Sequence, residues 1–225
     1  MTIQDVRGKE SEFTLDNNAF EALPNIHSDM KYDDWTNEET IKNVYYPEVE
    51  RLLLEKVAGS HKIYLFDHTI RRPGTTRSAV TRVHIDQTPK STEARVRFHL
   101  PEEADELLRG RYRIINVWRP LNGPVQANPL AVADSATVRD EDLFPIEHRY
   151  PDRTGETAGV KYNSEQQWYY WSQMTNEERL FLKCFDSDEN VGRKGRVPHT
   201  AFEDPRTPKD APGRESIEVR ALVFG

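Results

Sequence analysis

The pattern of hydrophobic and polar positions predicts helices near the N-terminus. Thr36 and Glu39 have the spacing of a capping box, so a helix is expected to begin at Thr36. Pro47 begins a second helical run, stopped by Gly59, whose apolar residues share one face: Val49, Leu52, Leu53 and Val57. The first thirty residues carry no sustained period and are expected to be irregular surface chain. The two runs therefore predict a helix pair that covers a core.

Segments typical of β-strands dominate the rest of the chain. Alternation and β-branched or aromatic residues predict strands over 62–70, 79–86, 112–118, 130–133, 167–171, 178–185 and 216–224, with a short segment at 197–202. The strands 167–171 and 178–185 are expected to pair with each other. A short helix is predicted from Pro101 to Arg109, and the charged stretch 140–159 is predicted to be a long exposed loop. Many strands with a few N-terminal helices favour a mainly β fold, a two-sheet barrel or jelly roll under a helical cover.

Length and charge limit the class of protein. A chain of 225 residues with 36 % hydrophobic content is expected to form a single domain, 1–225, with an N-terminal elaboration over 1–60 and a β core over 61–225. The formal net charge of −7 leaves no excess of positive charge to neutralise phosphates. We therefore expect a small-molecule substrate and no nucleic acid.

The chain also carries no targeting or membrane signal. No apolar run approaches the roughly 20 residues needed to cross a bilayer, and the stretch from Met1 to Asp16 is polar. The expected location is the cytoplasm, without a membrane partner. A homodimer is compatible with an enzyme of this size, although no coiled-coil pattern indicates one.

Cysteine content decides which metal sites are open to this chain. Cys184 is the only cysteine, which excludes an intrachain disulfide and a thiolate-rich zinc site. Glycine-rich phosphate loops, a nucleophile elbow and an HExxH zinc helix are also absent from the sequence. Any metal must therefore be held by histidines and carboxylates.

Two His-x-Asp runs are candidates for such a site. Residues i and i+2 of a strand point to the same side, so His-x-Asp places an imidazole beside a carboxylate. His84 and Asp86 close a predicted strand, whereas His27 and Asp29 lie in an unpatterned stretch after Pro24. Two histidines and one carboxylate can occupy one face of an octahedral iron and leave the opposite face open. We therefore favour His84 and Asp86, for which a strand-end histidine bonded to a carboxylate is the simpler alternative.

The C-terminal segment supplies a third ligand candidate and an anchor for an anion. His199 follows Pro198, and Arg214 and Ser216 lie two residues apart at the start of the last strand, so they face the same side. Arginine offers two parallel hydrogen bonds to a carboxylate, and the serine hydroxyl adds a third. The order His-x-Asp, His, Arg-x-Ser therefore indicates a metal site followed by an anchor for a dicarboxylate.

Longer blocks around these residues carry a family resemblance. Residues 62–225 resemble the AsaB-type hydroxylase/desaturase family, a branch of the Fe(II)/2-oxoglutarate oxygenases of secondary metabolism. The blocks are 66–71, 83–86, 116–120 with 129–131, 183–187, 198–202 with 204–205, and 214–220.

The resemblance implies a double-stranded β-helix, a jelly-roll or cupin-like core, with the N-terminal helices packed on one sheet. It also implies Fe(II) bound by His84, Asp86 and His199, with 2-oxoglutarate as cosubstrate, O2 as oxidant, and succinate and CO2 as products. Arg214 and Ser216 would bind the far carboxylate of 2-oxoglutarate. The interval of 15 residues from His199 to Arg214 is longer than is usual in these oxygenases.

Five further residues are weaker candidates. Arg220 lies at an even offset from Arg214 and is a second candidate for the anchor; the alternative is an ion pair with Glu218 or another acid. Asn116 is a candidate for contact with the cosubstrate. The remaining candidates, for the substrate, lie near the ends of predicted strands: Trp118, Arg119 and His68. A core or surface role is the simpler explanation for each of these.

The sequence leaves the reaction open among hydroxylation, desaturation and oxidative cyclisation. Two other functions remain as alternatives: a non-catalytic cupin-like protein that binds a small carboxylate or a partner, and metal-assisted hydrolysis by the same ligands. Metal-assisted hydrolysis does not account for the Arg-x-Ser pair, because a hydrolase needs no anchor for a dicarboxylate.

Overall fold

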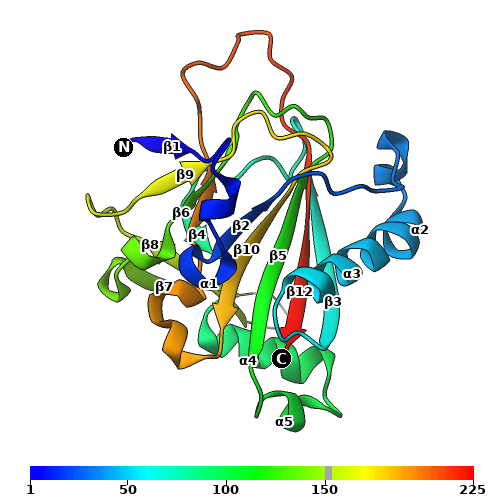
Figure 1. Cartoon of the computed structure of the whole chain (residues 1–225), viewed down its shortest axis with the longest axis vertical. Coiled ribbons are helices and arrows are strands. Elements are labelled where there is room, and N and C mark those ends of the chain that lie inside the picture. Colours follow the sequence, from blue (N-terminus) through cyan, green and yellow to red (C-terminus); the bar gives the residue numbers. More distant parts are fainter. Residues whose placement is uncertain (150–153) are drawn as a thin grey trace.

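Two β-sheets face each other in the structure of the protein, a computed structural model that describes residues 1–149 and 154–225 (Figure 1). The five-stranded sheet has the order β2 (Phe20–Leu23), β10 (Arg179–Asp186), β5 (Tyr112–Pro120), β12 (Ser216–Phe224), β3 (Lys62–Arg71). The seven-stranded sheet has the order β1 (Ile3–Asp5), β9 (Trp168–Tyr170), β6 (Leu130–Ala133), β11 (His199–Ala201), β4 (His84–Ile85), β8 (Thr154–Val160), β7 (Leu143–Arg149). All neighbouring strands are antiparallel except β1 and β9. The predicted mainly β, two-sheet fold is confirmed.

Alternation along the central strands separates an inner and an outer face of the five-stranded sheet. On β5 and β12 one set of apolar residues enters the core between the sheets: Ile114, Trp118, Leu222 and Phe224. The other set enters a second core outside that sheet: Ile115, Val117, Val219 and Val223. Because neighbours in sequence point to opposite faces, the even-numbered residues of β12 all face the interior.

The N-terminal helices cover the outer face of the five-stranded sheet. They are α2 (Glu38–Thr40), the π-helical turn η3 (Ile41–Tyr45) and α3 (Tyr46–Lys56), and the apolar face of α3 joins the outer core as predicted. The predicted helix pair is instead one run of helix. Its cap is Asn37, not Thr36, because the Asn37 side chain accepts hydrogen bonds from the backbone N–H groups of Glu39 and Thr40.

Several strand predictions were wrong in extent or pairing. The predicted strand 79–86 is reduced to His84 and Ile85, and the predicted loop 140–159 contains most of the β7–β8 hairpin. Residues 150–153 of that loop lie outside the described residues. β9 and β10 do not pair, because β9 joins β1 and β6 while β10 joins β2 and β5. Local patterns identified β9 and β10 but could not identify their partners.

Short elements complete the fold. The predicted helix 101–109 is only α5 (Ala104–Leu107), and the helix α4 (Pro89–His99) was missed although Thr88 caps it through Ser91. The N-terminal stretch expected to be irregular holds β1, β2 and α1 (Leu15–Asn18). The remaining helices are 3-10 turns: η1 (Glu10–Glu12), η2 (Tyr32–Thr36), η4 (Ser135–Thr137), η5 (Asp140–Asp142) and η6 (Glu189–Gly195).

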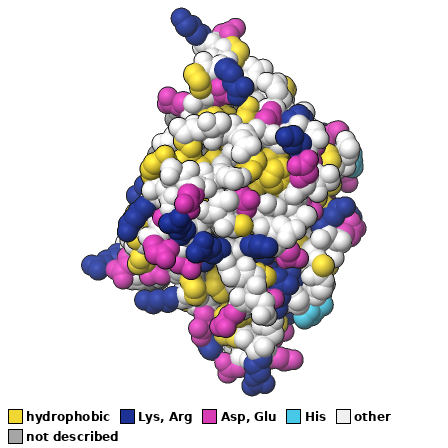
Figure 2. Space-filling view, turned by 60° about the vertical axis from the view of Figure 1, so that its left-hand side comes forward, with side chains coloured by type: hydrophobic (Ala, Val, Ile, Leu, Met, Phe, Trp, Pro, Cys, Tyr) yellow, Lys and Arg dark blue, Asp and Glu magenta, His cyan; other side chains and the backbone are white. Residues whose placement is uncertain are grey.

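The surface carries mixed charges. Figure 2 shows one face of the molecule on which basic and acidic side chains lie interspersed. Among the described residues, no helix has both the length and the apolar character needed to cross a membrane.

Candidate metal centre and anion site

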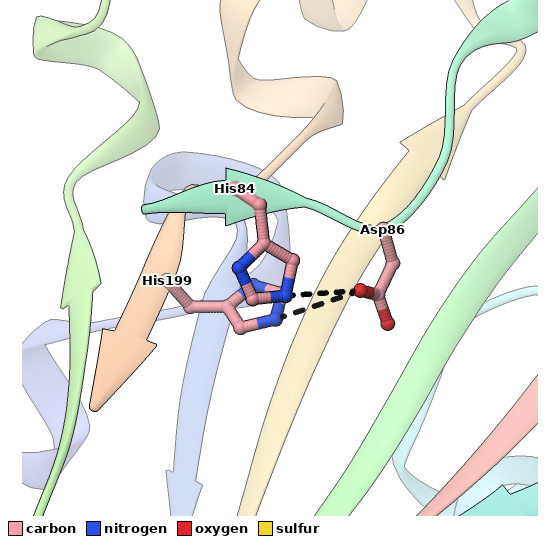
Figure 3. Close-up of side chains that lie close together, drawn as sticks. All are labelled: His84, Asp86 and His199. Atoms are coloured by element: carbon pink, nitrogen blue, oxygen red, sulfur yellow. Dashed lines mark ion pairs between the residues drawn. The ribbon is translucent and has the colours of Figure 1, made fainter. Parts of the chain in front are cut away.

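Three side chains from the interior of the seven-stranded sheet converge on one point. His84 of β4 and His199 of β11 are cross-strand partners, and Asp86 follows two residues after His84 on the same side of the chain (Figure 3). Asp86 Oδ1 lies 3.3 Å from His84 Nε2 and 3.9 Å from His199 Nε2. One potential ligand atom from each residue lies within 4.8 Å of the others. The structure therefore brings together the three residues singled out as metal ligands from the sequence.

Backbone carbonyl groups fix the orientation of both imidazole rings. His84 Nδ1 lies 2.8 Å from the carbonyl oxygen of Arg82, and His199 Nδ1 lies 3.2 Å from that of Val197. A carbonyl only accepts, so each Nδ1 carries the proton and donates it. With Nδ1 committed to a carbonyl group, Nε2 is the ring nitrogen that each histidine can offer to a metal.

Asp86 is held in its charged form and in a fixed orientation. The Asn116 amide donates a hydrogen bond of 2.8 Å to Asp86 Oδ2, which leaves Oδ1 facing the histidines. Burial alone would raise the pKa of Asp86, but the His84 hydrogen bond and the charges of His199 and Arg220 hold it well below its usual range. Asn116 thus contacts a candidate ligand, whereas the sequence suggested the cosubstrate.

The two histidines differ in their affinity for protons. Burial and the nearby charge of His84 lower the pKa of His199 to about 4. Burial would also lower the pKa of His84, but the hydrogen bond and charge of Asp86 outweigh it and raise that pKa. At neutral pH His199 is therefore the neutral imidazole that a metal requires.

The donor set suits an iron ion of the two-histidine, one-carboxylate type. Two imidazole nitrogens and one carboxylate oxygen are close enough to share a single ion. In the described part of the chain, this is the one group of at least three His, Cys, Asp or Glu side chains with that spacing. A ligand set of three leaves coordination positions for a chelating cosubstrate.

Arg214 is a buried cation without an acidic partner. Its guanidinium donates one hydrogen bond of 2.8 Å to the carbonyl oxygen of Asn128 and lies 5.3 Å from the ring centre of Trp118. Its Nε atom is buried and has no hydrogen-bond partner among the described residues. Burial and the charge of Arg71 lower the pKa of Arg214 to about 10. A buried guanidinium that lacks an acidic partner can bind an anion.

Arg220 differs from Arg214 because acids already surround it. Its Nε lies 2.9 Å from Asp67 Oδ1, and its Nη2 donates to the Thr69 hydroxyl. Burial would lower the pKa of Arg220, but the charges of Asp86, Glu218 and Asp67 raise it. Of the two arginines proposed from the sequence as anchors, Arg220 is therefore the charge-compensated one.

Glu218 was missed as a site residue. It lies between Ser216 and Arg220 on the inward face of β12 and is 9 % exposed. In the described residues it makes no hydrogen bond or ion pair, and burial together with the charge of Asp86 raises its pKa. The alternation of the last strand already placed it inward with Ser216.

Three residues predicted to contact the substrate lie outside the cluster of His84, Asp86 and His199. Arg119 lies on the outer face, where it stacks on Trp35 and donates to the hydroxyl of Ser28. His68 also faces outward and contacts the hydroxyl of Tyr46 at 2.9 Å. Trp118 faces inward but packs against Arg214.

The second His-x-Asp run stays apart from the cluster. His27 and Asp29 form an exposed pair at 3.2 Å, and each side chain is 81 % exposed. The structure gives the pair no third ligand, since the only such group in the described residues is that of His84.

Replacing Asn116 tests the support that this residue gives to Asp86. We expect Asn116→Ala to weaken iron binding by about 10- to 100-fold, because Asp86 loses the hydrogen bond that orients it. The measurement is an anaerobic Fe(II) titration. Asn163→Ala is the matched control, because it removes an amide-to-carboxylate bond to Asp142 away from the cluster. Equal iron affinities of the two variants would contradict the role of Asn116.

One family model and several known proteins are similar to this chain. Residues 1–224 match the family model described as "Oxidoreductase/YMDC permease-like domain". The chain is 35 % identical to hydroxylase/desaturase poxK of Penicillium oxalicum over all of its own length and 78 % of the relative. It is 44 % identical to hydroxylase/desaturase asaB of Aspergillus flavus over 54 % of this chain and 59 % of the relative.

A solved structure is similar over the whole fold. The iron and alpha-ketoglutarate-dependent endoperoxidase NvfI superposes with a TM-score of 0.91 and 31 % identity, covering 99 % of this chain and 84 % of NvfI. The predicted jelly-roll core with helices on one sheet is confirmed by this match.

Proposed function

The chain belongs to the family of Fe(II)- and 2-oxoglutarate-dependent hydroxylases and desaturases, and from this premise we propose that His84, Asp86 and His199 bind its iron. The enzyme is thus a non-haem dioxygenase that acts on a small molecule, with Fe(II), 2-oxoglutarate and O2 as predicted. The observation that supports the ligand assignment is the shared orientation of the two imidazoles. Both Nδ1 atoms are committed to carbonyl groups, and both Nε2 atoms face Asp86.

Arg214 and Ser216 are proposed to hold the far carboxylate of 2-oxoglutarate. Both belong to the inward face at the start of β12, and Arg214 has a buried Nε without a partner. An incoming carboxylate would supply the missing acceptor and the missing negative charge. Arg220 is the weaker anchor, because Asp67 already compensates its charge.

The residues of the site contribute orientation and exclusion of water. Fe(II) bound here would activate O2, the oxidant, with 2-oxoglutarate supplying two of the electrons and leaving as succinate and CO2. His84, Asp86 and His199 would hold the ion between the sheets, and Asn116 keeps Asp86 from turning. Apolar residues around these groups, such as Val132 and Val197, exclude water.

A cavity with a mostly apolar surface lies near the cluster and is a candidate binding site for the small-molecule substrate. A cavity of about 410 Å³ includes Gln87, the neighbour of Asp86, and Cys184 of β10. The β7–β8 hairpin supplies much of its apolar lining, including Leu143, Phe144 and Pro145. We propose that the substrate enters here. The fate of the substrate then depends on its placement relative to the iron.

Spectroscopy tests the ligand and cosubstrate assignments directly. We expect anaerobic addition of Fe(II) and 2-oxoglutarate to give the visible charge-transfer band of the chelate. Folded protein that binds neither component would disprove the site. Tight zinc binding without affinity for 2-oxoglutarate would support hydrolysis instead.

Other expectations from the sequence stay predictions. These are the single-domain organisation, the cytoplasmic location, the absence of a nucleic-acid partner and the homodimer. The reaction type also stays open among hydroxylation, desaturation and cyclisation. A screen for succinate release against candidate metabolites would identify the substrate.

A further inference from the structure

Arg71 is a second guanidinium beside the proposed anchor, and it was not among the site residues predicted from the sequence. It ends β3, and its cross-strand partner on β12 is Ser216. Directly opposed residues of antiparallel strands have Cβ atoms about 4.5–5.5 Å apart and point to the same face. Arg71 therefore emerges beside the hydroxyl that is proposed to bind a carboxylate.

The face of β3 that carries Arg71 is the inward one. Asp67 and Thr69, at even offsets from Arg71, both contact Arg220 from that face. His68, at an odd offset, faces outward toward Tyr46. Arg71 thus belongs to the same interior as Ser216 and Glu218.

The chain is packed so that the Arg71 and Arg214 segments lie against each other. Pro73 follows Arg71 by two residues, and Gly213 immediately precedes Arg214. A Cβ atom on Gly213 would lie 2.4 Å from Pro73 Cγ, so glycine is what permits this close approach. The segments that carry Arg71 and Arg214 are thereby held together at one end of the five-stranded sheet.

Charge at this position is not compensated by an ion pair. Arg71 Nη1 donates to the neutral carbonyl oxygen of Ser78 at 3.1 Å. In the described ranges no carboxylate forms an ion pair with Arg71 or Arg214, and Glu218, the acid whose charge acts on both, also shares the charge of Arg220. Positive charge from Arg71 also lowers the pKa of Arg214, which agrees with the close approach of the two segments. Two cations held together without an ion pair form a site for an anion.

We propose that Arg71 binds the far carboxylate of 2-oxoglutarate together with Arg214 and Ser216. This inference rests on the proposed function, because it assumes that the dicarboxylate lies between the iron and β12. Arg214 and Arg71 come from different strands, so they approach the carboxylate from two sides. Each oxygen of the carboxylate then has a guanidinium donor, and the serine hydroxyl adds a further bond.

The test compares two 2-oxo acids that differ only at the far end of the site. Both 2-oxoglutarate and 2-oxobutyrate offer the same chelating group to iron, but only 2-oxoglutarate has a far carboxylate. The affinity of each for the Fe(II)-loaded protein is measured anaerobically from the charge-transfer band. The variants are Arg71→Met, Arg71→Lys and Arg214→Met, with Arg72→Met as the control. Arg72 is the adjacent arginine, and its Nε is already paired with Glu215 at 2.9 Å.

We expect Arg71→Met to weaken 2-oxoglutarate binding by about 10- to 100-fold, the effect of losing a hydrogen bond between charged groups. Its affinity for 2-oxobutyrate should equal that of the wild type, as should its iron affinity and its thermal unfolding midpoint. Arg71→Lys should lie between Arg71→Met and the wild type, because lysine keeps the charge but not the fork. Arg72→Met should leave both 2-oxo acid affinities unchanged.

Other outcomes overturn the inference in distinguishable ways. If Arg71→Met binds 2-oxoglutarate like the wild type while Arg214→Met does not, the proposed anchor stands and Arg71 serves another ligand, such as an anionic substrate. If Arg71→Met weakens both 2-oxo acids equally, its effect lies at the metal end or in the fold. Absence of the band in the wild type would instead reject the proposed function itself.

Discussion

Replacement of His199 by alanine is expected to abolish tight iron binding. The variant loses one of three ligands, and the effect should exceed the about 10- to 100-fold loss typical of removing an outer hydrogen bond to a ligand. His199 is 3 % exposed, so no surface group can take its place. Anaerobic Fe(II) titration and the charge-transfer band with 2-oxoglutarate provide the measurements, and 2-oxoglutarate turnover should disappear with them.

His27→Ala is the matched control for this experiment. His27 also has an aspartate two residues on, at 3.2 Å, but the pair is exposed and has no third ligand among the described residues. Iron affinity should therefore equal that of the wild type. Equal losses in the two variants would mean that the wrong His-x-Asp run has been assigned.

Replacement of Arg214 by methionine is expected to weaken 2-oxoglutarate binding by about 100-fold or more. Methionine fills a similar volume but removes a charge-assisted fork, in which a hydrogen bond to a charged group contributes about 1.5–3 kcal/mol. Iron affinity should persist, because Arg214 contacts none of the three candidate ligands. The concentration of 2-oxoglutarate that gives half of the charge-transfer band measures the effect.

Arg220→Met separates the two arginines that the sequence could not rank. Removing Arg220 leaves Asp67, Asp86 and Glu218 without the cation that they share. We therefore expect a lower unfolding midpoint and weaker iron binding, because the loss of a buried charge partner destabilises its neighbours. A selective loss of 2-oxoglutarate affinity in Arg220→Met, with Arg214→Met unaffected, would reverse the assignment.

Local sequence determined the parts of this protein that depend on neighbours along the chain. The last strand, 216–224, and the strand 130–133 were predicted with their observed bounds, because alternation and β-branched residues act over a few positions. The same i, i+2 rule placed Asp86 beside His84 and Ser216 beside Arg214. The signal for α4, Thr88 before Pro89, was also present in the sequence, because a capping threonine followed by proline is typical of a helix start.

Tertiary structure decided whatever depends on contacts between distant segments. Register alone makes His84 and His199 partners, although they are 115 positions apart in the chain. Likewise, Arg220 and Arg214 look equivalent in sequence until Asp67 of β3 compensates one of them and Arg71 of β3 adds charge beside the other. A side chain's charge state and free hydrogen-bonding capacity are set by what packs against it, and packing partners come from strands that no local period identifies.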